Sequence, residues 1–331
     1  MKIYLLNFFL FLFAGLANAQ NAISVEKVSL TVSNLEKSVP FYANLLDFNV
    51  NASYELKGEA FRNLYGIDNV KTTARVVLLS LGNEKVELIE FIDEDRKLRI
   101  PEDSKSNDGW FQHMAIVVSN MEEAYKKLLE NGVEHVSTRP QTLPEYISAA
   151  AGIKAFYFKD PDGHNLEIIF FPQGKGNPKW QGQTEKLFLG IDHTAIGIGK
   201  TSIAMPLYRD ILEMNLTGSS NNFGYEQEHL NQVFGANLVI SGLTAKRGIS
   251  IEFLDYIAPP GGRSYPKDSQ TTDLWHWHTT ITVNNLDEIF TQLTSKGYPL
   301  ISSGLIKTKT ENLLMFRDID GHALLLKQLK L

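Results

Sequence analysis

The chain repeats itself, and this repeat constrains its fold more than any other feature of the sequence. The segments PEDSKSNDGWFQHMAIVV and PKDSQTTDLWHWHTTITV run in register, and they place His113 and His278 165 residues apart. Glu87 and Glu252 are also 165 residues apart. The chain is therefore a tandem duplication, and we expect its two halves to fold alike.

Each half also repeats within itself. The stretches VEKVSLTVSNLEKSV and FQHMAIVVSNMEEAY share one plan, a short alternating run typical of a strand followed by a helix. Ser33 with Glu36, and Ser119 with Glu122, have the spacing of a capping box at the start of these helices. Further β-rich runs, separated by turns, follow each helix. The sequence therefore predicts four strand–helix–strands modules, at residues 22–95, 108–172, 188–258 and 273–331.

A module of this size is too small to bury a good core alone, so the modules are expected to pair. A polar segment at 173–187 lies between the halves and is predicted to be a linker. We therefore expect two domains, at 22–172 and 188–331.

The N-terminus has the pattern of a secretory signal at residues 1–19. Lys2 is followed by an apolar run that ends in Ala17-Asn18-Ala19, which predicts cleavage after Ala19. The apolar run is shorter than the roughly 20 residues that a membrane span needs, and no cysteine stands at the cleavage point to carry a lipid anchor. We expect a periplasmic or secreted protein that has no membrane association after cleavage.

Composition limits the cofactors and partners. The chain has no cysteine, so any metal ligands must be His, Asp or Glu. The net charge is −6 and no basic block occurs, which argues against a nucleic-acid partner. Four modules in one chain can complete their sites internally, so a monomer that binds a small-molecule substrate is expected.

The first strand of each module has two distinct faces, because side chains alternate along a strand. One face mostly suits packing under a helix. The other face is small or polar and starts with His113, His193 or His278 in three modules and with Lys27 in the first. This pattern is typical of strands that line a cleft.

The turn and strand DPDGHNLEI (160–168) and the strand and helix HMAIVVSNMEEA (113–124) resemble the vicinal oxygen chelate superfamily. Its members include glyoxalase I, extradiol dioxygenases, methylmalonyl-CoA epimerase and bleomycin- or fosfomycin-resistance proteins. The resemblance covers nearly all of the chain after residue 19. It implies an α+β, glyoxalase-like fold, in which four βαβββ modules pair into two cupped mixed β-sheets around a metal.

The resemblance also implies the ligand positions, which are the first inward residue of strand one and a Glu on the last strand of each module. In chain order these are Lys27 and Glu87, His113 and Glu167, His193 and Glu252, and His278 and Leu325. Lys27 and Leu325 depart from the pattern, because neither side chain is a plausible ligand at neutral pH.

Two module pairings remain open. If module one pairs with two and three with four, each site lacks one ligand. If two pairs with three and one with four, as in single-chain glyoxalase I, both departures fall in one site. We favour the second pairing, because a duplicated chain needs only one working site. The metal ligands would then be His113, Glu167, His193 and Glu252, with His278 and Glu87 as the second choice.

Two imidazoles and two carboxylates suit Zn, Ni, Co, Mn or Fe(II). By resemblance to glyoxalase I, Glu167 or Glu252 would be the catalytic base of a metal-dependent lyase or isomerase. Such an enzyme transfers a proton α to a carbonyl. Because glutathione adducts are mainly cytosolic, an exported enzyme is expected to act on a small hydroxy-carbonyl compound instead.

Two alternatives remain. The first is an Fe(II) extradiol-type ring-cleaving dioxygenase that uses His193, His278 and Glu252. The second is a non-catalytic small-molecule binding protein.

Several other residues are weaker candidates. His229, Tyr225 and Arg62 lie in segments that often cover the cleft in relatives, so they are candidates for substrate contact. His164 and His322 follow an Asp-x-Asp-Gly turn, and we interpret them as structural residues of that turn.

Overall fold

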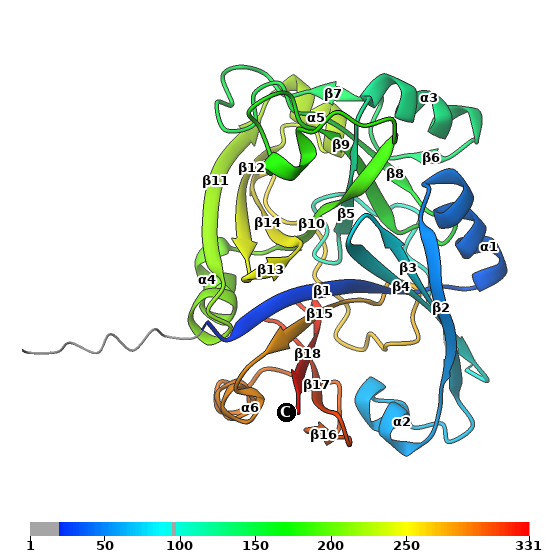
Figure 1. Ribbon diagram of the computed structural model, residues 1–331. Coiled ribbons are helices and arrows are strands. Elements are labelled where there is room, and N and C mark those ends of the chain that lie inside the picture. Colours follow the sequence, from blue (N-terminus) through cyan, green and yellow to red (C-terminus); the bar gives the residue numbers. More distant parts are fainter. Residues whose placement is uncertain (1–19, 95–96, 331) are drawn as a thin grey trace, which may run out of the picture.

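The computed structural model describes residues 20–94 and 97–330, so the predicted signal at 1–19 lies outside the described residues. Within these ranges the chain forms two nine-stranded mixed sheets with short helices (Figure 1). The predicted α+β class and the plan of repeated modules in two mixed sheets are confirmed.

Modules one and two each start with a strand and a helix. The elements of module one are β1 (Ala22–Thr31), α1 (Leu35–Pro40), a π-helical turn (Phe41–Leu45), β2 (Asn49–Leu56), α2 (Glu59–Tyr65), β3 (Thr73–Leu81) and β4 (Glu84–Ile92). Those of module two are β5 (Gln112–Val118), α3 (Met121–Glu130), β6 (Glu134–His135), β7 (Gln141–Thr142), β8 (Lys154–Lys159) and β9 (Asn165–Phe170).

Modules three and four repeat this order after a single 3-10 turn, η2 (Pro178–Trp180), in the linker. Module three comprises β10 (Phe188–Ile198), α4 (Thr201–Met205), a π-helical turn (Pro206–Ile211), β11 (Asn215–Phe223), α5 (Tyr225–Asn231), β12 (Asn237–Thr244), β13 (Arg247–Gly248) and β14 (Ser250–Ala258). Module four comprises β15 (Trp277–Val283), α6 (Leu286–Ser295), β16 (Ile306–Lys307), β17 (Glu311–Arg317) and β18 (Ala323–Leu329).

The modules pair crosswise. One sheet has the order β16-β17-β18-β15-β1-β4-β3-β2 and joins modules one and four; the short β13 of module three is its ninth strand and pairs with β1. The other has the order β11-β12-β14-β10-β5-β9-β8-β6 and joins modules two and three; its ninth strand, β7, pairs with β8. Figure 1 shows β1 and β15, from opposite ends of the colour scale, side by side. This is the pairing that the sequence favoured, and each half of the chain contributes one module to each sheet.

The packing face of each first strand is buried, as the alternation predicted. Val28, Met114, Ile196 and Ile281 are at most 4% exposed and belong to one hydrophobic cluster that includes residues of all four modules. The opposite face of each strand is therefore left for the polar residues that start it.

The helices begin one residue later than the predicted capping boxes imply. Asn34 and Asn120 are the N-caps, and the side-chain oxygen of each accepts a hydrogen bond from the backbone amide three residues ahead. The capping boxes predicted at Ser33 and Ser119 are therefore wrong. The hydroxyl of Ser119 instead donates to the carbonyl of Lys186 in the linker, at 2.7 Å. Within the described ranges no helix is long and apolar enough to cross a membrane.

The Asp-x-Asp-Gly-His turn has a structural role that joins modules. Asp160 accepts hydrogen bonds from Tyr42 Oη of module one, at 3.0 Å, and from His164 Nδ1, at 2.9 Å. His164 Nε2 donates to the carbonyl of Leu274, which precedes β15 of module four, at 2.6 Å. Burial alone would lower the pKa of His164, but Asp160 outweighs this and raises it, which suits a ring that donates from both nitrogens.

The second copy of the turn makes equivalent contacts. Tyr208 Oη donates to Asp318, at 2.8 Å, and His322 Nε2 donates to the carbonyl of Gly197, at 2.6 Å. This explains why the turn persists in module four although the following strand carries Leu325 in place of a glutamate: the turn fastens modules together.

Candidate metal centre and its cavity

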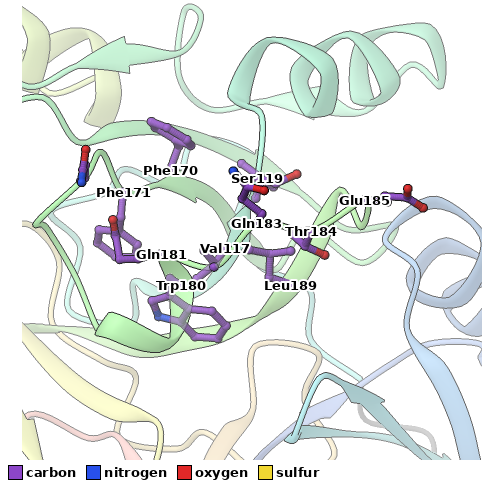
Figure 2. A pocket seen from close by; sticks show the side chains of 13 residues that line it. Val117, Ser119, Phe170, Phe171, Trp180, Gln181, Gln183, Thr184, Glu185 and Leu189 are labelled. Atoms are coloured by element: carbon purple, nitrogen blue, oxygen red, sulfur yellow. The ribbon is translucent and has the colours of Figure 1, made fainter.

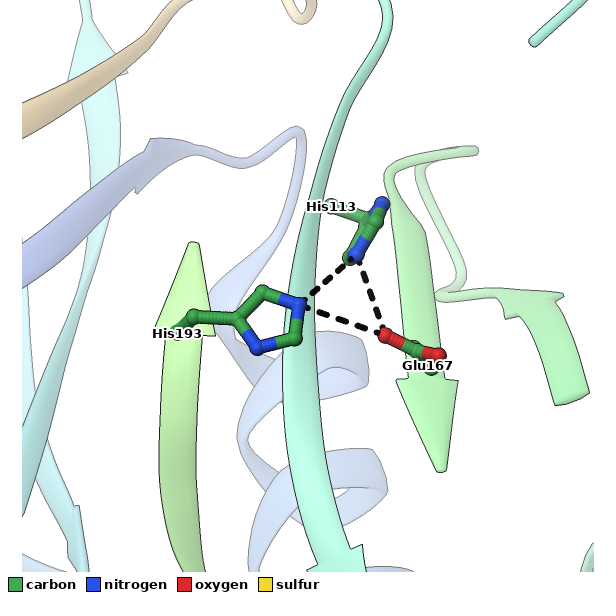
Figure 3. A group of neighbouring side chains, drawn as sticks. All are labelled: His113, Glu167 and His193. Atoms are coloured by element: carbon green, nitrogen blue, oxygen red, sulfur yellow. Dashed lines mark hydrogen bonds and ion pairs between the residues drawn. The ribbon is translucent and has the colours of Figure 1, made fainter. Parts of the chain in front are cut away.

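Two histidines and a glutamate converge on one face of the sheet formed by modules two and three (Figure 3). His113 lies on β5, Glu167 on β9 and His193 on β10, which are neighbouring strands. His113 Nε2 lies 3.1 Å from Glu167 Oε2 and 3.3 Å from His193 Nε2. The remaining distance, from His193 Nε2 to Glu167 Oε2, is 3.5 Å. All three side chains are buried.

This cluster has the donor set and the spacing of a divalent metal site. Ligands held about 2.0–2.2 Å from a tetrahedral ion lie roughly 3.3–3.6 Å from one another. The three separations of 3.1, 3.3 and 3.5 Å are close to this range. A search of the described residues for three or more His, Cys, Asp or Glu side chains with ligand atoms within 4.8 Å of one another finds this cluster. The residues present therefore fit such an ion.

The orientation of His193 is set by the residue before it. Asp192 Oδ2 lies 3.1 Å from His193 Nδ1, and Trp180 Nε1 donates to Asp192 Oδ1 at 2.6 Å. Neighbours in a regular strand point to opposite faces, but β10 has a register shift between Ile191 and His193. This bulge brings the carboxylate beside the ring. A protonated Nδ1 leaves Nε2 to face the cluster, an arrangement common among metal-binding histidines.

Glu252, the fourth predicted ligand, lies at the edge of the cluster. Its Oε2 is 3.5 Å from His193 Nε2, but it lies outside the group whose atoms are all within 4.8 Å. Its side chain is 26% exposed, against 5% for Glu167. Glu167 is thus enclosed by the two imidazoles, whereas Glu252 has access to the space in front of them.

The two carboxylates differ in proton affinity. Burial alone would raise the pKa of Glu167, but hydrogen bonds with His113 and His193 outweigh it and lower the pKa to about 2. Burial raises the pKa of Glu252, and Asp192 and Glu167 add to this effect against the lowering by His193. Neighbouring carboxylates whose pKa values are pushed apart are typical of sites that transfer protons.

A cavity of about 750 Å³ opens onto the cluster, and its lining includes all four predicted ligands. One part of its wall is apolar and comprises Leu143, Ile153, Ala155, Leu230, Ile240 and Leu254. Another part carries hydroxyls and amides, from Thr217, Ser219, Ser220, Asn222 and Gln227. A concave, partly apolar space with a few convergent polar groups is the usual form of a small-molecule site.

A second hollow of about 750 Å³ lies beneath the linker (Figure 2). Its lining combines apolar side chains such as Val117, Phe170 and Leu189 with glutamines of the linker. Its titratable residue is the exposed Glu185, and no histidine lines it. We therefore assign the chemistry to the cavity at the His–Glu cluster.

In the other sheet, the equivalent positions do not form such a cluster. Glu87 is ion-paired with Lys27 and accepts a hydrogen bond from Tyr54 Oη. The ammonium group of Lys27 therefore lies beside the carboxylate where a bound cation would be expected. His278, the other second-choice ligand, pairs through Nδ1 with His276 Nε2 at 3.1 Å, and burial lowers the pKa of His278 to about 4.

Leu325 packs in an apolar cluster that covers this face of the sheet. Its partners include Phe61 and Tyr65 of α2, together with Phe91 and Met315. The position that carries a carboxylate in module two thus carries part of a hydrophobic core in module four.

The weaker substrate-contact candidates lie away from the main cavity. Arg62 is on α2 of the other sheet and donates to the carbonyl of Val70 at 3.3 Å. Tyr225 is 58% exposed and stacks on His229, with ring centroids 4.0 Å apart. Tyr225 and His229 do not line the cavity, whereas Gln227 of the same helix does.

Sequence reasoning missed Asp192, Trp180, Asn222 and Gln227. Asp192 directly precedes a predicted ligand, but strand alternation assigned it to the opposite face. Trp180 lies in the segment taken as a linker. A position-by-position comparison of the two halves would have indicated Gln227, because the repeat aligns it with the apolar Phe61.

The Glyoxalase/Bleomycin resistance protein/Dioxygenase superfamily model matches residues 24–168. The match covers modules one and two, which together are less than half of the chain. The resemblance predicted from the sequence is thereby confirmed. The second half shares the superfamily fold, because modules three and four repeat the same element order and complete the same two sheets.

Solved structures support the same fold over most of the chain. Glyoxalase I from Zea mays aligns with a TM-score of 0.59 and 15% identity, covering 92% of each chain. A dioxygenase candidate from Bacillus subtilis aligns with a TM-score of 0.56 and 14% identity, covering 94% of this chain and 86% of that one. Likeness at this identity shows the fold alone. Among curated proteins no sequence match was found.

Proposed function

We propose that the chain is an exported, metal-dependent lyase or isomerase that transfers a proton α to the carbonyl of a small hydroxy-carbonyl compound. The observation that carries this proposal is the buried cluster of His113, Glu167 and His193, with Glu252 facing the same cavity. The superfamily match, and the likeness to glyoxalase I from Zea mays in fold, are consistent with this chemistry.

The residues of the cluster divide into two roles. His113, His193 and Glu167 would hold the ion, because their ligand atoms point at one another inside the protein. When bound, a divalent ion supplies Lewis-acid polarisation of a carbonyl oxygen. Glu252 is the candidate base, because it is partly exposed and lines the cavity. The proton that Glu252 would take from the hydroxyl-bearing α-carbon returns to the former carbonyl carbon, and the α-hydroxyl proton passes to the former carbonyl oxygen, so the isomerisation needs no external oxidant or reductant.

The substrate class follows from the predicted export and from the cavity wall. An exported enzyme meets few glutathione adducts, and the hydroxyl and amide groups of the wall suit a small polar molecule. We propose a small hydroxy-carbonyl compound as substrate, with neither a nucleic-acid nor a membrane partner, and a monomeric protein.

Metal content by mass spectrometry tests the site. We expect about one divalent ion per chain in the wild type, a loss of that ion in His113→Ala and its retention in His278→Ala. Retention by His113→Ala, or loss caused by His278→Ala alone, would show that the ion binds elsewhere.

Exchange of the α-proton tests the reaction. Zinc-, nickel- or manganese-loaded protein is incubated with dihydroxyacetone in D₂O, and deuterium incorporation is followed by NMR. We expect Glu252→Gln to slow the exchange by about 10²–10⁴-fold with the metal retained, which is the usual contribution of a positioned general base. Unchanged exchange in this variant would exclude Glu252 as the base.

A second candidate function has one specific observation in its favour. Two histidines and one carboxylate form the ligand set of many non-haem Fe(II) oxygenases, and His113, His193 and Glu167 make up such a set. The set expected from the sequence, His193, His278 and Glu252, does not come together, because His278 lies on β15 of the other sheet. Oxygen uptake by Fe(II)-loaded protein with catechol as the probe would favour this candidate. If the wild type holds no metal at all, a non-catalytic small-molecule binding protein becomes the better hypothesis.

A further inference from the structure

The two sheets differ most where a helix covers the inner face. α2 and α5 are equivalent helices, and each begins after a glycine with positive φ, Gly58 (88°) and Gly224 (93°). The third and seventh residues of α2 are Phe61 and Tyr65, which help to fill the apolar cluster around Leu325. At the same positions α5 has Gln227 and Asn231.

The strands below these helices show the same exchange. In the sheet of modules one and four, Leu56 on β2 pairs with Ala74 on β3, which pairs with Phe91 on β4. In the other sheet, Asn222 on β11 pairs with Leu238 on β12, which pairs with Tyr256 on β14. Four positions that are apolar or aromatic in one sheet are therefore amides or a tyrosine in the sheet that holds the His–Glu cluster.

The four polar side chains form a continuous hydrogen-bonded chain, which we call the amide chain. Asn222 Nδ2 donates to Gln227 Oε1 at 3.0 Å, and Gln227 Nε2 donates to Asn231 Oδ1 at 2.7 Å. Asn231 Nδ2 then donates to Tyr256 Oη. All four residues are at most 4% exposed. Each inner member is satisfied by its neighbours, as buried polar groups usually are.

The end of the amide chain at Asn222 is open. Asn222 Oδ1 is buried and has no hydrogen-bond partner in the described part of the protein. Asn222 and Gln227 both line the cavity that contains the His–Glu cluster. Reversing all the amides would expose an NH₂ group in place of the carbonyl, so the same end would still lack a partner. Leaving such a group unpaired costs free energy, and a ligand or an ordered water that reaches it removes this cost.

We propose that Asn222, supported by Gln227, binds a hydroxyl group of the substrate and so determines specificity for hydroxylated over deoxy carbonyl compounds. This inference rests on the proposed function, because it names a recognition group for the same cavity. A hydroxyl can both donate and accept, so it matches either orientation of the amide. The nearby Thr217, Ser219 and Ser220 add further neutral hydrogen-bonding groups to this wall.

The test compares binding of matched pairs to zinc-loaded protein by calorimetry. The pairs are D-xylulose with 1-deoxy-D-xylulose, and dihydroxyacetone with hydroxyacetone. We expect the wild type to bind the hydroxylated member at least about tenfold more tightly. The deoxy analogue lacks the hydroxyl, so it leaves the buried amide without a hydrogen-bond partner and binds more weakly. Asn222→Leu, which copies Leu56 of the other sheet, should reduce this preference to within about threefold. Gln227→Leu should also weaken it, because Asn222 then loses its hydrogen-bonding partner.

The matched control is Asn221→Leu, which makes the same substitution one residue away, at an exposed position of β11. It should keep the wild-type preference, and all variants should keep the metal. The inference is overturned if the wild type shows no preference, if it binds none of these compounds, or if Asn221→Leu and Asn222→Leu behave alike. Failure of both Asn222→Leu and Gln227→Leu to fold would also overturn it, because the amides would then serve the fold.

The outcomes also separate this inference from the proposed function. Preferential binding of hydroxylated compounds without α-proton exchange in D₂O would support the recognition group and reject the reaction. Exchange without any hydroxyl preference would support the reaction and reject the recognition group.

Discussion

Asp192→Asn is the substitution that most directly tests how a residue behind a metal ligand affects metal affinity. Asp192 receives hydrogen bonds from two donors, His193 Nδ1 at 3.1 Å and Trp180 Nε1 at 2.6 Å. Asparagine keeps the shape of the side chain but has one acceptor oxygen in place of two. Its NH₂ group would therefore face one of these N–H groups, and the negative charge behind the imidazole would be lost.

The expected loss is about 10- to 100-fold in metal affinity, or roughly 1.4–2.7 kcal/mol. This is smaller than the cost of breaking a fully buried charge pair, because the Asp192 side chain is 18% exposed and water can partly replace its partners. Trp180→Phe removes one donor and leaves the charge, so its effect should lie at the lower end of this range.

Zinc affinity is measured by competition with a chromophoric chelator. The matched control is Glu26→Gln, because Glu26 precedes Lys27 as Asp192 precedes His193, and β1 has an equivalent register shift there. This control should bind zinc like the wild type. The reasoning fails if Asp192→Asn binds zinc within twofold of the wild type, or if Glu26→Gln weakens binding equally.

Three further substitutions test the rest of the structure. Tyr42→Phe should lower the free energy of unfolding in urea by about 1.5–3 kcal/mol, because it removes a donor to the buried carboxylate of Asp160; an effect below 0.5 kcal/mol would contradict this. Lys27→Met removes the ion-pair partner of Glu87 and should cost about 2–4 kcal/mol at pH 7, somewhat reduced by the 21% exposure of Lys27. Burial raises the pKa of Glu87 but the Lys27 ammonium and hydrogen bonds lower it overall, so its stabilisation is complete above the unfolded pKa of about 4.3. It is lost as the pH falls further, and the difference between wild type and variant in acid urea titrations should shrink below about pH 4. Leu325→Glu should destabilise the protein by about 3 kcal/mol or more without adding a second metal equivalent, because it buries a carboxylate among apolar side chains; two ions per chain by mass spectrometry would refute this.

The sequence was sufficient to predict the positions of the cluster, for a definite physical reason. A strand alternates its faces with a period of two, so a repeated His at the start of the inner face and a Glu on the last strand must point the same way. The crosswise pairing was also predictable, because Lys27 and Leu325 then fall in one sheet. In the structure Lys27 forms an ion pair with Glu87, and Leu325 lies in an apolar cluster.

What the sequence did not indicate depends on departures from regular geometry and on contacts between distant segments. Asp192 reaches His193 only because a bulge overrides the alternation. Trp180 comes from the predicted linker, and Gln227 reaches the cavity wall because α5 packs against strands of module two as well as its own. A one-residue error at the helix caps has a local cause, since Asn34 and Asn120 are better placed acceptors than the preceding serines.

The crosswise sheets have a consequence for how the chain can be divided. Each sheet takes one module from either side of the linker, and the Tyr42–Asp160 and Tyr208–Asp318 contacts tie the modules within each half. A fragment ending at residue 172 would carry β5 and β9 but not β10, and so would lack His193. Neither half can assemble the centre alone, but the two fragments produced together have every strand needed to rebuild it. Cutting the linker should therefore disturb assembly of the centre less than deleting either half. A half-length chain with the same module order would have to dimerise to complete its sheets.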